Sequence, residues 1–394
     1  MSNPLRIAVA GGSMGGLTAA LLLRELGHDV TVYERSSVEL EQRGAGIGFL
    51  PDSSRYLVQR AGRSIEELAT VTHGIRYLDR NDRVVQEVPC TYHFSSWNTV
   101  YRNLLAEFGR DRYLLGREVV GREDADDSVT VLSADGSIVQ ADLLVAADGV
   151  GSTFRQQLMP EVHHQYAGYV AWRGMVPECD LPPQVAAVYD DSIVYYVYAN
   201  SHILLYPIPG PDGSVRRGDR LVNFVWYRNY SPGDDLHDLM VDVSGTHRDI
   251  SLPPGAVRQV HVDEMRATAA ARLPGAISSV VLAVEHPFLQ VVYDVEVPRM
   301  AFGRTCLIGD AGFVARPHAA AGTAKAAANA WALAEVLQRH DDVRSALEHW
   351  EVDQLELGRQ LLARTRRVGM RSQVTGDWDP QHPDVFFRLR EDGV

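Results

Sequence analysis

The amino-acid sequence predicts an α/β protein of two lobes, one with a parallel sheet and helices, the other with a mostly antiparallel β-sheet. An apolar strand, a glycine-rich turn and a helix within residues 5–35 indicate the first lobe. Two later apolar strands, at 143–147 and 307–308, are each followed closely by an aspartate and belong to the same lobe. Runs of aromatic and β-branched residues between 161 and 300 indicate the second lobe.

Composition limits the classes of partner. A chain of 394 residues can bury sizeable cores, and 38 basic against 51 acidic residues give a formal charge of −13. We expect neither nucleic acid nor an anionic membrane as partner, because phosphate groups require a basic surface.

The cysteines and the hydropathy pattern indicate a location. Cys90, Cys179 and Cys306 have no metal-ligand spacing, which favours a reducing compartment, no disulfide framework and no metal site. No stretch has the length of a membrane span or the layout of a signal peptide. We therefore expect a soluble, cytoplasmic protein.

Residues 5–35 form a predicted Rossmann-like βαβ unit, with strands at 5–10 and 30–34 and a helix at 14–26. Its turn follows the GxGxxG fingerprint, with Gly11 at the tight turn and Gly16 at the helix–strand contact. Ser13 takes the middle position, where a small residue admits a pyrophosphate. Gly12 and Met14 complete this predicted cofactor-binding turn.

Two residues at the end of the second strand indicate which nucleotide binds. Glu34 follows the glycines by roughly 20 residues, where a carboxylate pairs with ribose hydroxyls and repels a 2′-phosphate. Arg35 either lies against the adenine or is solvated. The unit predicts a dinucleotide with free ribose hydroxyls but does not separate NAD from FAD.

Between residues 36 and 160 three segments complete the predicted cofactor site. A glycine-rich loop at 43–47 can approach a ligand through its backbone. A helix at 97–109 places Arg102 away from its apolar side, and the strand at 143–147 presents Asp148. Short strands at 75–79 and 84–88 form a predicted hairpin that starts a separate sheet.

Residues 304–330 are predicted to join cofactor and substrate. A buried strand ends at Ile308, and Asp310 presents a carboxylate at the strand end, where open α/β sheets bind ligands. Pro317 ends the turn, and Gly322 with Thr323 opens a helix at 324–337. Its first N–H groups are unpaired and attract negative charge.

Three blocks identify a family resemblance. GGSMGG with Glu34, DLLVAADGVGSTFR at 142–155 and GRTCLIGDAGFVARP at 303–317 occur in the order and spacing of the single-component FAD-dependent aromatic hydroxylases, the para-hydroxybenzoate hydroxylase-like flavoprotein monooxygenases. The chain resembles this family over almost its whole length. YAGYVAWRG, HILLYPIPG and RPHAAAG most resemble the hydroxylases of 2,6-dihydroxypyridine and related N-heterocycles.

The resemblance implies how the chain divides. It implies an FAD-binding lobe from residues 1–73, 91–160 and 301–372. The substrate lobe takes the strands at 74–90 and the sheet at 161–300, and a polar tail occupies 373–394. A helix at 343–370 is expected to pack or to support a dimer, so the protein is a monomer or a homodimer.

The resemblance also implies cofactor contacts. Arg102 would lie near the FAD phosphates, and Asp310 near the ribityl or phosphate region. Asp148 would influence both FAD and the visiting nicotinamide. The family loop along the isoalloxazine matches Arg43, Gly44, Ala45, Gly46 and Ile47. Helix N–H groups near Gly322 and Thr323 would stabilise negative charge on the pyrimidine edge of the reduced flavin, and Ala321 beside them is also a predicted cofactor contact. The chain departs from the family pattern at Ala146, Ala321 and Asn329.

The implied reaction is hydroxylation of an electron-rich hydroxylated aromatic or N-heterocyclic ring. NADH or NADPH reduces FAD, O2 adds to it, and a flavin 4a-hydroperoxide transfers oxygen to the ring. One alternative is an FAD oxidoreductase of the same fold that performs epoxidation, ring opening or oxygen-independent dehydrogenation. A second alternative is a non-catalytic FAD-binding protein.

Substrate contacts are predicted where polar groups interrupt apolar runs. His318 is the first candidate, as a hydrogen-bonding group or a base, and strand alternation puts His202 and Tyr206 on one face. Tyr206 is a second catalytic candidate. The other predicted substrate-binding residues are Asn223, Trp226, Arg316 and Pro317. We expect Glu34 and Asp310 to face one continuous trough.

Overall fold

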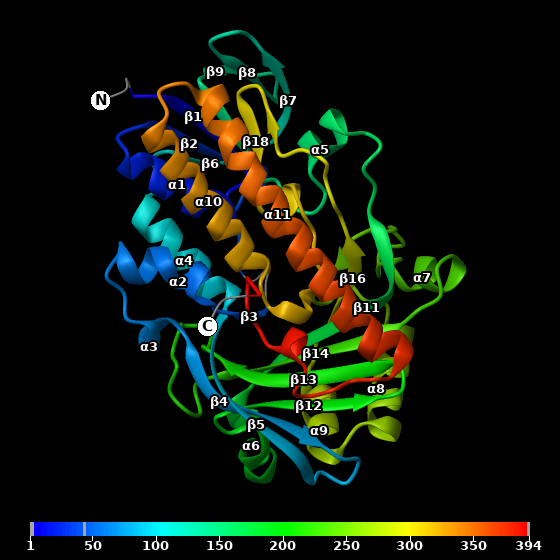
Figure 1. Ribbon diagram of the computed structural model, residues 1–394. Helices are drawn as coiled ribbons and strands as arrows, with labels where there is room; N and C mark the ends of the chain where they lie inside the picture. Colours follow the sequence, from blue (N-terminus) through cyan, green and yellow to red (C-terminus); the bar gives the residue numbers. More distant parts are fainter. Residues whose placement is uncertain (1–3, 42–44, 392–394) are drawn as a thin grey trace.

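The computed structural model describes residues 4–41 and 45–391 and contains, over these residues, three β-sheets that belong to two lobes (Figure 1). The six-stranded sheet has the order β17 (Ala301–Phe302), β18 (Thr305–Leu307), β10 (Leu143–Ala146), β1 (Arg6–Ala10), β2 (Asp29–Glu34) and β6 (Tyr113–Leu115). A small sheet beside it comprises β7 (Val119–Asp124), β8 (Val129–Ser133) and β9 (Ile138–Ala141).

Parallel pairing in the six-stranded sheet brings three strand ends together. β1 pairs in parallel with β2 and β10, and β10 pairs in parallel with β18. The residues that follow β1, β10 and β18 therefore share one edge, as expected for a Rossmann-like lobe. The helices of this lobe are α1 (Met14–Glu25), α2 (Pro51–Gln59), α3 (Ile65–Leu68), α4 (Trp97–Phe108), α5 (Thr153–Leu158), α10 (Gly322–Arg339) and α11 (Val343–Met370).

The second lobe is a nine-stranded sheet, antiparallel except where β12 pairs with β4. Its order is β15 (Ser251–Leu252), β16 (Phe288–Asp294), β11 (Gln165–Pro177), β14 (Leu221–Asn229), β13 (Ser201–Ile208), β12 (Ser192–Tyr198), β4 (Thr70–Leu78), β5 (Val84–Ser96) and β3 (Gly46–Gly48). Its helices are α6 (Pro183–Tyr189), α7 (Asp234–Leu239), α8 (Gln259–Arg272) and α9 (Gly275–Ala283). The mostly antiparallel sheet confirms the predicted fold class.

The two faces of this sheet bury different sets of side chains. Phe224 and Trp226 of β14 pack with α8 and α9 in one apolar cluster. Val225 and Tyr227 of the same strand pack with residues of β13 and α10 on the opposite face. Because side chains alternate along a strand, only the second face is available to a site between the lobes.

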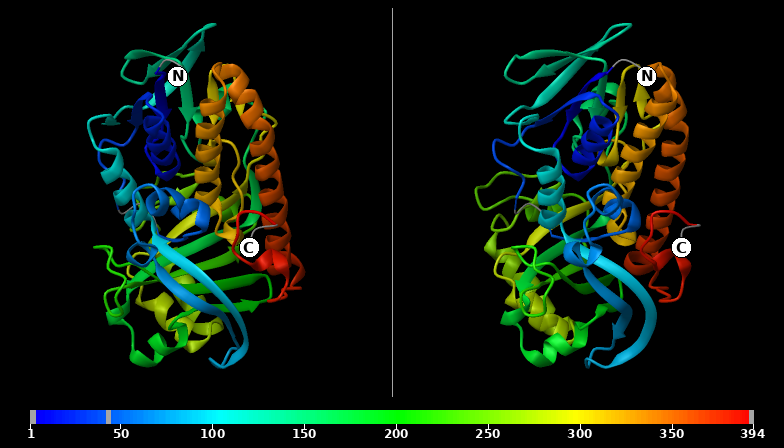
Figure 2. Two further views of the ribbon diagram at one scale, coloured as in Figure 1. Left: turned by 60° about the vertical axis from the view of Figure 1, so that its left-hand side comes forward. Right: turned by 90° about the vertical axis from the view of Figure 1, so that its left-hand side faces the viewer.

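The hairpin predicted at 75–79 and 84–88 exists, but its strands are much longer, since β5 continues to Ser96. Pro89 follows the predicted end of the second strand directly, yet β5 continues through it. β3 pairs only with residues 94–96 of β5, so Pro89 lies where the strand has no outer neighbour and needs no N–H donor. Figure 2 shows this long hairpin curving around the sheet lobe.

Two helices of the sheet lobe depend on their surroundings. α7 ends at Leu239, because residues 241 and 242 form β-bridges instead. α9 was not predicted, since its sequence GAISSVVLA is rich in β-branched residues. Its burial against the sheet outweighs that low propensity.

The helix predicted at 343–370 matches α11. After it, the chain turns back toward the sheet lobe (Figure 1). Within the described residues no helix is both long and apolar enough to cross a membrane, and no His, Cys, Asp and Glu group could hold a metal ion.

Candidate active site

A first cavity, of about 260 Å³, lies at the shared edge of β1, β2 and β10 and is called here the strand-edge cavity. Its predicted members are Gly11, Ser13, Glu34, Arg35 and Asp148. The others are Ala10, Tyr33, Leu40, Glu118, Val119, Ala147, Gly149, Gly151 and Thr153.

Glu34 is held rigidly in this cavity. Its carboxylate is 5% exposed and accepts hydrogen bonds from the backbone N–H groups of Gly12 (2.9 Å) and Ser36 (2.8 Å). Gly12 is fixed in turn, because its carbonyl accepts from the hydroxyl of Tyr113 at 2.9 Å. The carboxylate therefore keeps its position at the end of β2.

The turn that starts α1 leaves backbone donors free for a ligand. Gly11 has a φ of 109°, and a Cβ there would overlap the carbonyl oxygen of Ala147. Gly16 lies so close to Gly11 that a Cβ would overlap its carbonyl oxygen, so the fingerprint glycines pack as expected. The first N–H groups of α1 lack a side-chain cap.

Asp148 brings a second carboxylate to the strand-edge cavity. One oxygen accepts from the N–H of Thr153 at 2.8 Å, and the other is buried with no hydrogen-bond partner among the described residues. Burial raises the pKa of this carboxyl above its ordinary value. The unpaired oxygen can accept a hydrogen bond from a hydroxyl group of a ligand.

Arg155 ties the strand-edge loops to each other. Its buried guanidinium donates to the carbonyl oxygens of Asp310 and Ala311, both at 3.0 Å, and to that of Val150. The loops after β10 and β18 are therefore held in a defined relative position.

A second cavity, of about 220 Å³, lies between the nine-stranded sheet and the turn that precedes α10, and is called here the interlobe cavity. Its predicted members are Gly46, Ile47, His202, Tyr206, Asp310, Pro317, His318, Ala321, Gly322 and Thr323. Aromatic side chains from four separate segments, Phe94, Tyr195, Tyr227, Trp378 and Phe387, form much of its wall.

Gly46 in β3 is held by three polar side chains from the sheet. The hydroxyl of Tyr206 (3.1 Å) and the guanidinium of Arg173 (2.7 Å) donate to its carbonyl oxygen. Its N–H donates to the side-chain oxygen of Asn223 at 3.1 Å. Burial raises the pKa of Tyr206, so the hydroxyl remains a donor at neutral pH.

His318 and His202 lie side by side, with ring centroids 5.3 Å apart. His318 shares a hydrogen bond of 2.6 Å between Nε2 and the hydroxyl of Tyr169, and its Nδ1 is buried without a partner within the described chain. Burial lowers the pKa of His202 to about 3 and that of His318 well below its ordinary value. Both rings are therefore neutral at pH 7, so they can interact with a ligand through hydrogen bonds but not through a positive charge.

The start of α10 forms the opposite wall. No side chain caps this helix within the described residues, and its first turn holds no acidic residue. Thr323 keeps a buried hydroxyl oxygen without a partner among them. Gly322 has no atom within 4 Å of the place where a Cβ would be, so this helix end offers donors to an anionic group.

Asp310 is placed at the interlobe cavity by a lysine that sequence reasoning missed. Lys325, 2% exposed, makes an ion pair of 2.9 Å with Asp310 and also donates to the carbonyl oxygen of Phe313. The Asp310 side chain itself remains 42% exposed. The sequence feature that could have indicated this contact is a single lysine in the alanine-rich start of α10.

Several predicted residues do not line either cavity. Trp226 is fully buried on the helix-covered face and donates to Ser201 at 3.0 Å, because positions 223 and 226 point to opposite faces of a strand. Its predicted contact with substrate is therefore wrong. Arg316 pairs with Asp294 at 2.8 Å behind the cavity, so it lies outside the predicted substrate contacts as well.

Among predicted cofactor residues, Met14 packs in the core of its lobe, and Gly12 contacts Glu34 without lining the cavity. Arg102 makes an ion pair of 2.8 Å with Glu41 and donates to the carbonyl of Pro211, so it lines neither cavity. Arg43 and Gly44 of the glycine-rich loop lie outside the described residues.

Glu34 and Asp310 line two different cavities, where one continuous trough was expected. Glu34 lines the strand-edge cavity and Asp310 lines the interlobe cavity, and the two linings share no residue. Both cavities still lie at the ends of adjacent strands, since β10 pairs with β18 on one side and β1 on the other.

Sequence reasoning also missed part of the aromatic wall. Trp378 and Phe387 come from a segment expected to be a polar tail, although its aromatic residues were visible in the sequence WDPQHPDVFFRL. Arg173 follows Trp172 in the sequence, and nothing in its spacing indicated that it would bind Gly46.

Comparison with known proteins decides the family. The chain is 37% identical over 390 residues to the 2,6-dihydroxypyridine 3-monooxygenase of Paenarthrobacter nicotinovorans, covering 98% of this chain and 96% of that one. The chain belongs to the FAD-dependent aromatic hydroxylases. It is a monooxygenase that uses FAD, NAD(P)H and O2.

Other members agree in sequence and fold. The structure of 2,6-dihydroxypyridine-3-hydroxylase from Arthrobacter nicotinovorans superposes with a TM-score of 0.94 at 34% identity, with all of both chains covered. The FAD-dependent urate hydroxylase of Klebsiella pneumoniae is 26% identical, over 98% of this chain and 95% of that one. A family model described as FAD binding domain-like matches residues 166–294.

The residues of both cavities fit FAD. Glu34 and the free donors of α1 suit an adenosine ribose and a pyrophosphate, and the unpaired oxygen of Asp148 suits a hydroxyl. The uncapped start of α10 and the unpaired hydroxyl of Thr323 suit the polar edge of an isoalloxazine. These individual contacts remain predictions.

Proposed function

We propose that the protein hydroxylates a carbon of a small hydroxylated N-heterocycle, such as a dihydroxypyridine. Two relatives are named for action on N-heterocycles, 2,6-dihydroxypyridine and urate, and both match nearly the whole chain.

One observation carries the proposal. A neutral His318, whose buried Nδ1 has no partner within the described residues, lines a cavity that also contains several aromatic side chains. An N-heterocycle with hydroxyl groups needs such a combination, in which aromatic surfaces hold the ring and a few polar atoms fix its orientation.

FAD, when bound, receives a hydride from the reduced nicotinamide and supplies activated oxygen to the ring. The chain's own contribution is orientation and exclusion of water. We infer that His318 Nδ1 makes a hydrogen bond to a hydroxyl or ring nitrogen of the substrate, while Tyr169 holds its Nε2. Because the pKa of His318 is low, it orients a hydroxyl better than it removes a proton.

Gly46 contributes through its fixed backbone. Arg173, Tyr206 and Asn223 keep β3 at the mouth of the interlobe cavity, so that Ile47 presents a constant surface to cofactor and ring. Tyr206 therefore acts through Gly46, as a positioning residue. The dry aromatic wall slows loss of hydrogen peroxide.

We place the reaction in the cytoplasm, since the three cysteines are free and reduced nicotinamide nucleotides are intracellular.

The test is a panel of hydroxylated pyridines, purines and benzoates offered to purified, FAD-loaded enzyme. We expect hydroxypyridines to accelerate NAD(P)H oxidation and to give a product that carries one atom of labelled O2. Acceleration only by carbocyclic compounds would overturn the heterocycle assignment, and a product without labelled oxygen would overturn hydroxylation.

A further inference from the structure

The segment that follows α11, residues 371–391, is called here the strap. It begins with a π-helical turn, Arg371–Thr375, and returns across the face of the nine-stranded sheet that faces the interlobe cavity. Trp378 and Phe387 of the strap line that cavity, while Phe387 and Leu389 are buried in the same apolar cluster as Tyr206 and Phe94. The strap is thus one wall of the site.

The two strap aromatics contact sheet residues that surround the cavity. The ring centroid of Trp378 lies 5.2 Å from that of His202 and 6.0 Å from that of Tyr195. Phe387 lies 5.1 Å from Tyr92 and 6.0 Å from Phe94 by the same measure. Its N–H also donates to the hydroxyl of Tyr92 at 3.1 Å, so this part of the wall is fixed to β5.

The strap also reaches a polar group of the site. Gln373 is 1% exposed, and its side-chain nitrogen lies 3.0 Å from Nδ1 of His202. The side-chain amide of Asn229 in β14 donates to the carbonyl of Gln373 at 2.8 Å. The orientation of the His202 ring therefore depends on where the strap lies.

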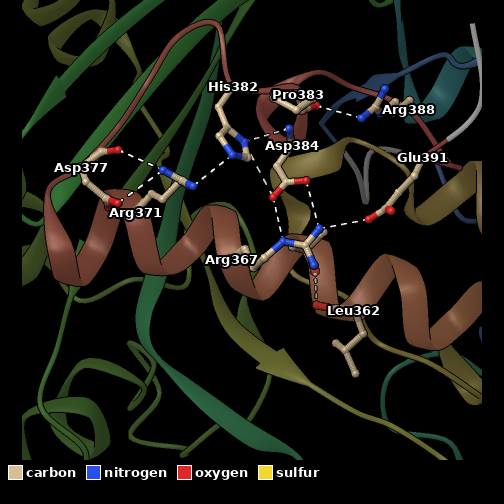
Figure 3. Close-up of polar contacts among 10 residues, drawn as sticks. Leu362, Arg367, Arg371, Asp377, His382, Pro383, Asp384, Arg388 and Glu391 are labelled. Atoms are coloured by element: carbon tan, nitrogen blue, oxygen red, sulfur yellow. Dashed lines mark hydrogen bonds and ion pairs between the residues drawn. The ribbon is translucent and has the colours of Figure 1, made fainter.

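Arg367 of α11 and Arg371, the first residue of the strap, hold the strap, as Figure 3 shows. Arg367 forms two hydrogen bonds to Asp384, of 2.8 and 3.0 Å, and one of 3.0 Å to Glu391. Arg371 pairs with Asp377 at 3.3 Å and contacts His382 at 3.0 Å. Arg367 holds the pKa of the buried Asp384 carboxyl below its ordinary value.

Bidentate pairing to a buried carboxylate is stronger and more directional than an exposed ion pair. The aromatic residues Trp378 and Phe387 each lie within a few positions of an arginine contact. Displacing these contacts would open the cavity to water on the strap side. The arginines touch no part of the cavity themselves, so they act by positioning.

We propose that the strap determines substrate size and coupling: Trp378 and Phe387 restrict the site to one ring, and Arg367 and Arg371 hold that wall against water. This inference rests on the proposed function, since it concerns the ring bound in the same cavity. The strap, which lies outside the sequence motifs, would then decide whether the enzyme accepts one-ring or two-ring compounds.

The experiment compares hydroxypyridines with hydroxyquinolines as probes on the FAD-loaded full-length enzyme. In wild type we expect hydroxypyridines alone to accelerate NAD(P)H oxidation. In Trp378→Ala and, independently, Phe387→Leu, the kcat/KM ratio of two-ring to one-ring compounds should rise about tenfold or more, since pocket shape is worth that much discrimination. Bound FAD should be unchanged.

The positioning arginines are tested by Arg367→Gln, with Arg367→Lys as the conservative variant. We expect a severalfold rise in hydrogen peroxide formed per NAD(P)H with a one-ring substrate, partly reversed by the lysine. The matched control is Arg83→Gln, which breaks an exposed pair with Asp79 on the β4–β5 hairpin. It should leave peroxide formation and ring preference as in wild type.

The outcomes separate the two claims. If no hydroxypyridine accelerates the wild type while another ring class does, the proposed function fails, and the strap is still judged by ring-size preference within that class. If wild type discriminates by ring size and both aromatic variants retain the same ratio, the strap inference is overturned. A rise in peroxide equal in Arg83→Gln and Arg367→Gln would overturn the role of the arginines.

Discussion

The strand-edge cavity and the interlobe cavity are built in different ways. The first uses mainly backbone: Gly11 and Ser13 line it from one turn, and Glu34 is held by two N–H groups. The second uses side chains from β5, β12, β13, β14, the turn before α10 and the strap, brought together from across the chain.

The difference teaches which part of an enzyme tolerates change. A backbone site depends on glycines that no other residue can replace, so a single methyl group is damaging. A side-chain wall can be altered residue by residue, with graded effects on what it binds. The predictions below test this contrast, beginning with the largest effect.

Gly11→Ala should abolish FAD binding. The added Cβ would overlap the carbonyl of Ala147, and the φ of 109° is costly for any residue except glycine. The ratio of flavin absorbance to protein absorbance measures the loss. Gly27→Ala is the matched control, because Gly27 has a φ of 87° but nothing within 4 Å. It should cost about 1 kcal/mol and retain FAD, and equal FAD loss in both variants would contradict the prediction.

His318→Ala should keep FAD yet separate NAD(P)H oxidation from hydroxylation, because the ring loses its orienting nitrogen. Hydrogen peroxide becomes the main product, and kcat/KM for hydroxylation falls about 100-fold, as for loss of one strong hydrogen bond in a buried site. Tyr169→Phe, which removes only the partner of Nε2, should give a smaller change in the same direction. If His318→Ala still couples NAD(P)H oxidation to hydroxylation as in wild type, this histidine has only a structural role.

Acid should destabilise the interlobe region through its histidines. The pKa of His202 falls from about 6.5 in the unfolded chain to about 3 in the folded one, so only the unfolded chain takes a proton between these values. The free energy of unfolding should therefore drop, as pH falls below 6.5, by about 1.4 kcal/mol per pH unit for this residue. Denaturant titrations from pH 7 to pH 5 should show a shallower slope in His202→Gln, and parallel slopes would refute the assignment.

Trp226→Phe should have the smallest effect. Trp226 lies on the helix-covered face of β14, and its N–H donates to Ser201. Losing that hydrogen bond should cost about 1 kcal/mol of stability, with KM and coupling unchanged. Val225→Ala, one position along on the cavity-facing side, should change KM. A changed KM in Trp226→Phe as well would show that the two faces are not independent.

Much of the fold followed from local pattern. The βαβ unit, the strand before Asp148, the strand before Asp310 and α11 lie within a few residues of their predicted places, since each has a strong apolar period and clear turn residues. The hairpin lengths and α9 did not follow. Pro89 is tolerated because of where β3 ends, and α9 forms because the sheet buries it.

In the candidate site, too, residues in local motifs could be predicted from the sequence, whereas contacts between distant segments could not. Gly11, Ser13 and Glu34, predicted from a fingerprint whose residues are close together in the chain, line one cavity in the structure. Trp226 was misplaced, although its odd spacing from Asn223 already required opposite faces. Lys325 beside Asp310 had no pattern to indicate it, because the contact arises only when α10 meets the loop after β18.

The sequence by itself therefore determined the cofactor class, the two-lobed fold and the order of the motifs, because these depend on short segments with fixed local geometry. Only the tertiary structure decided that Glu34 and Asp310 line different cavities, that both histidines are buried and neutral, and that Trp378 and Phe387 form part of the wall of the interlobe cavity. Burial and contact between distant segments are properties of the packed chain, and no local pattern specifies them.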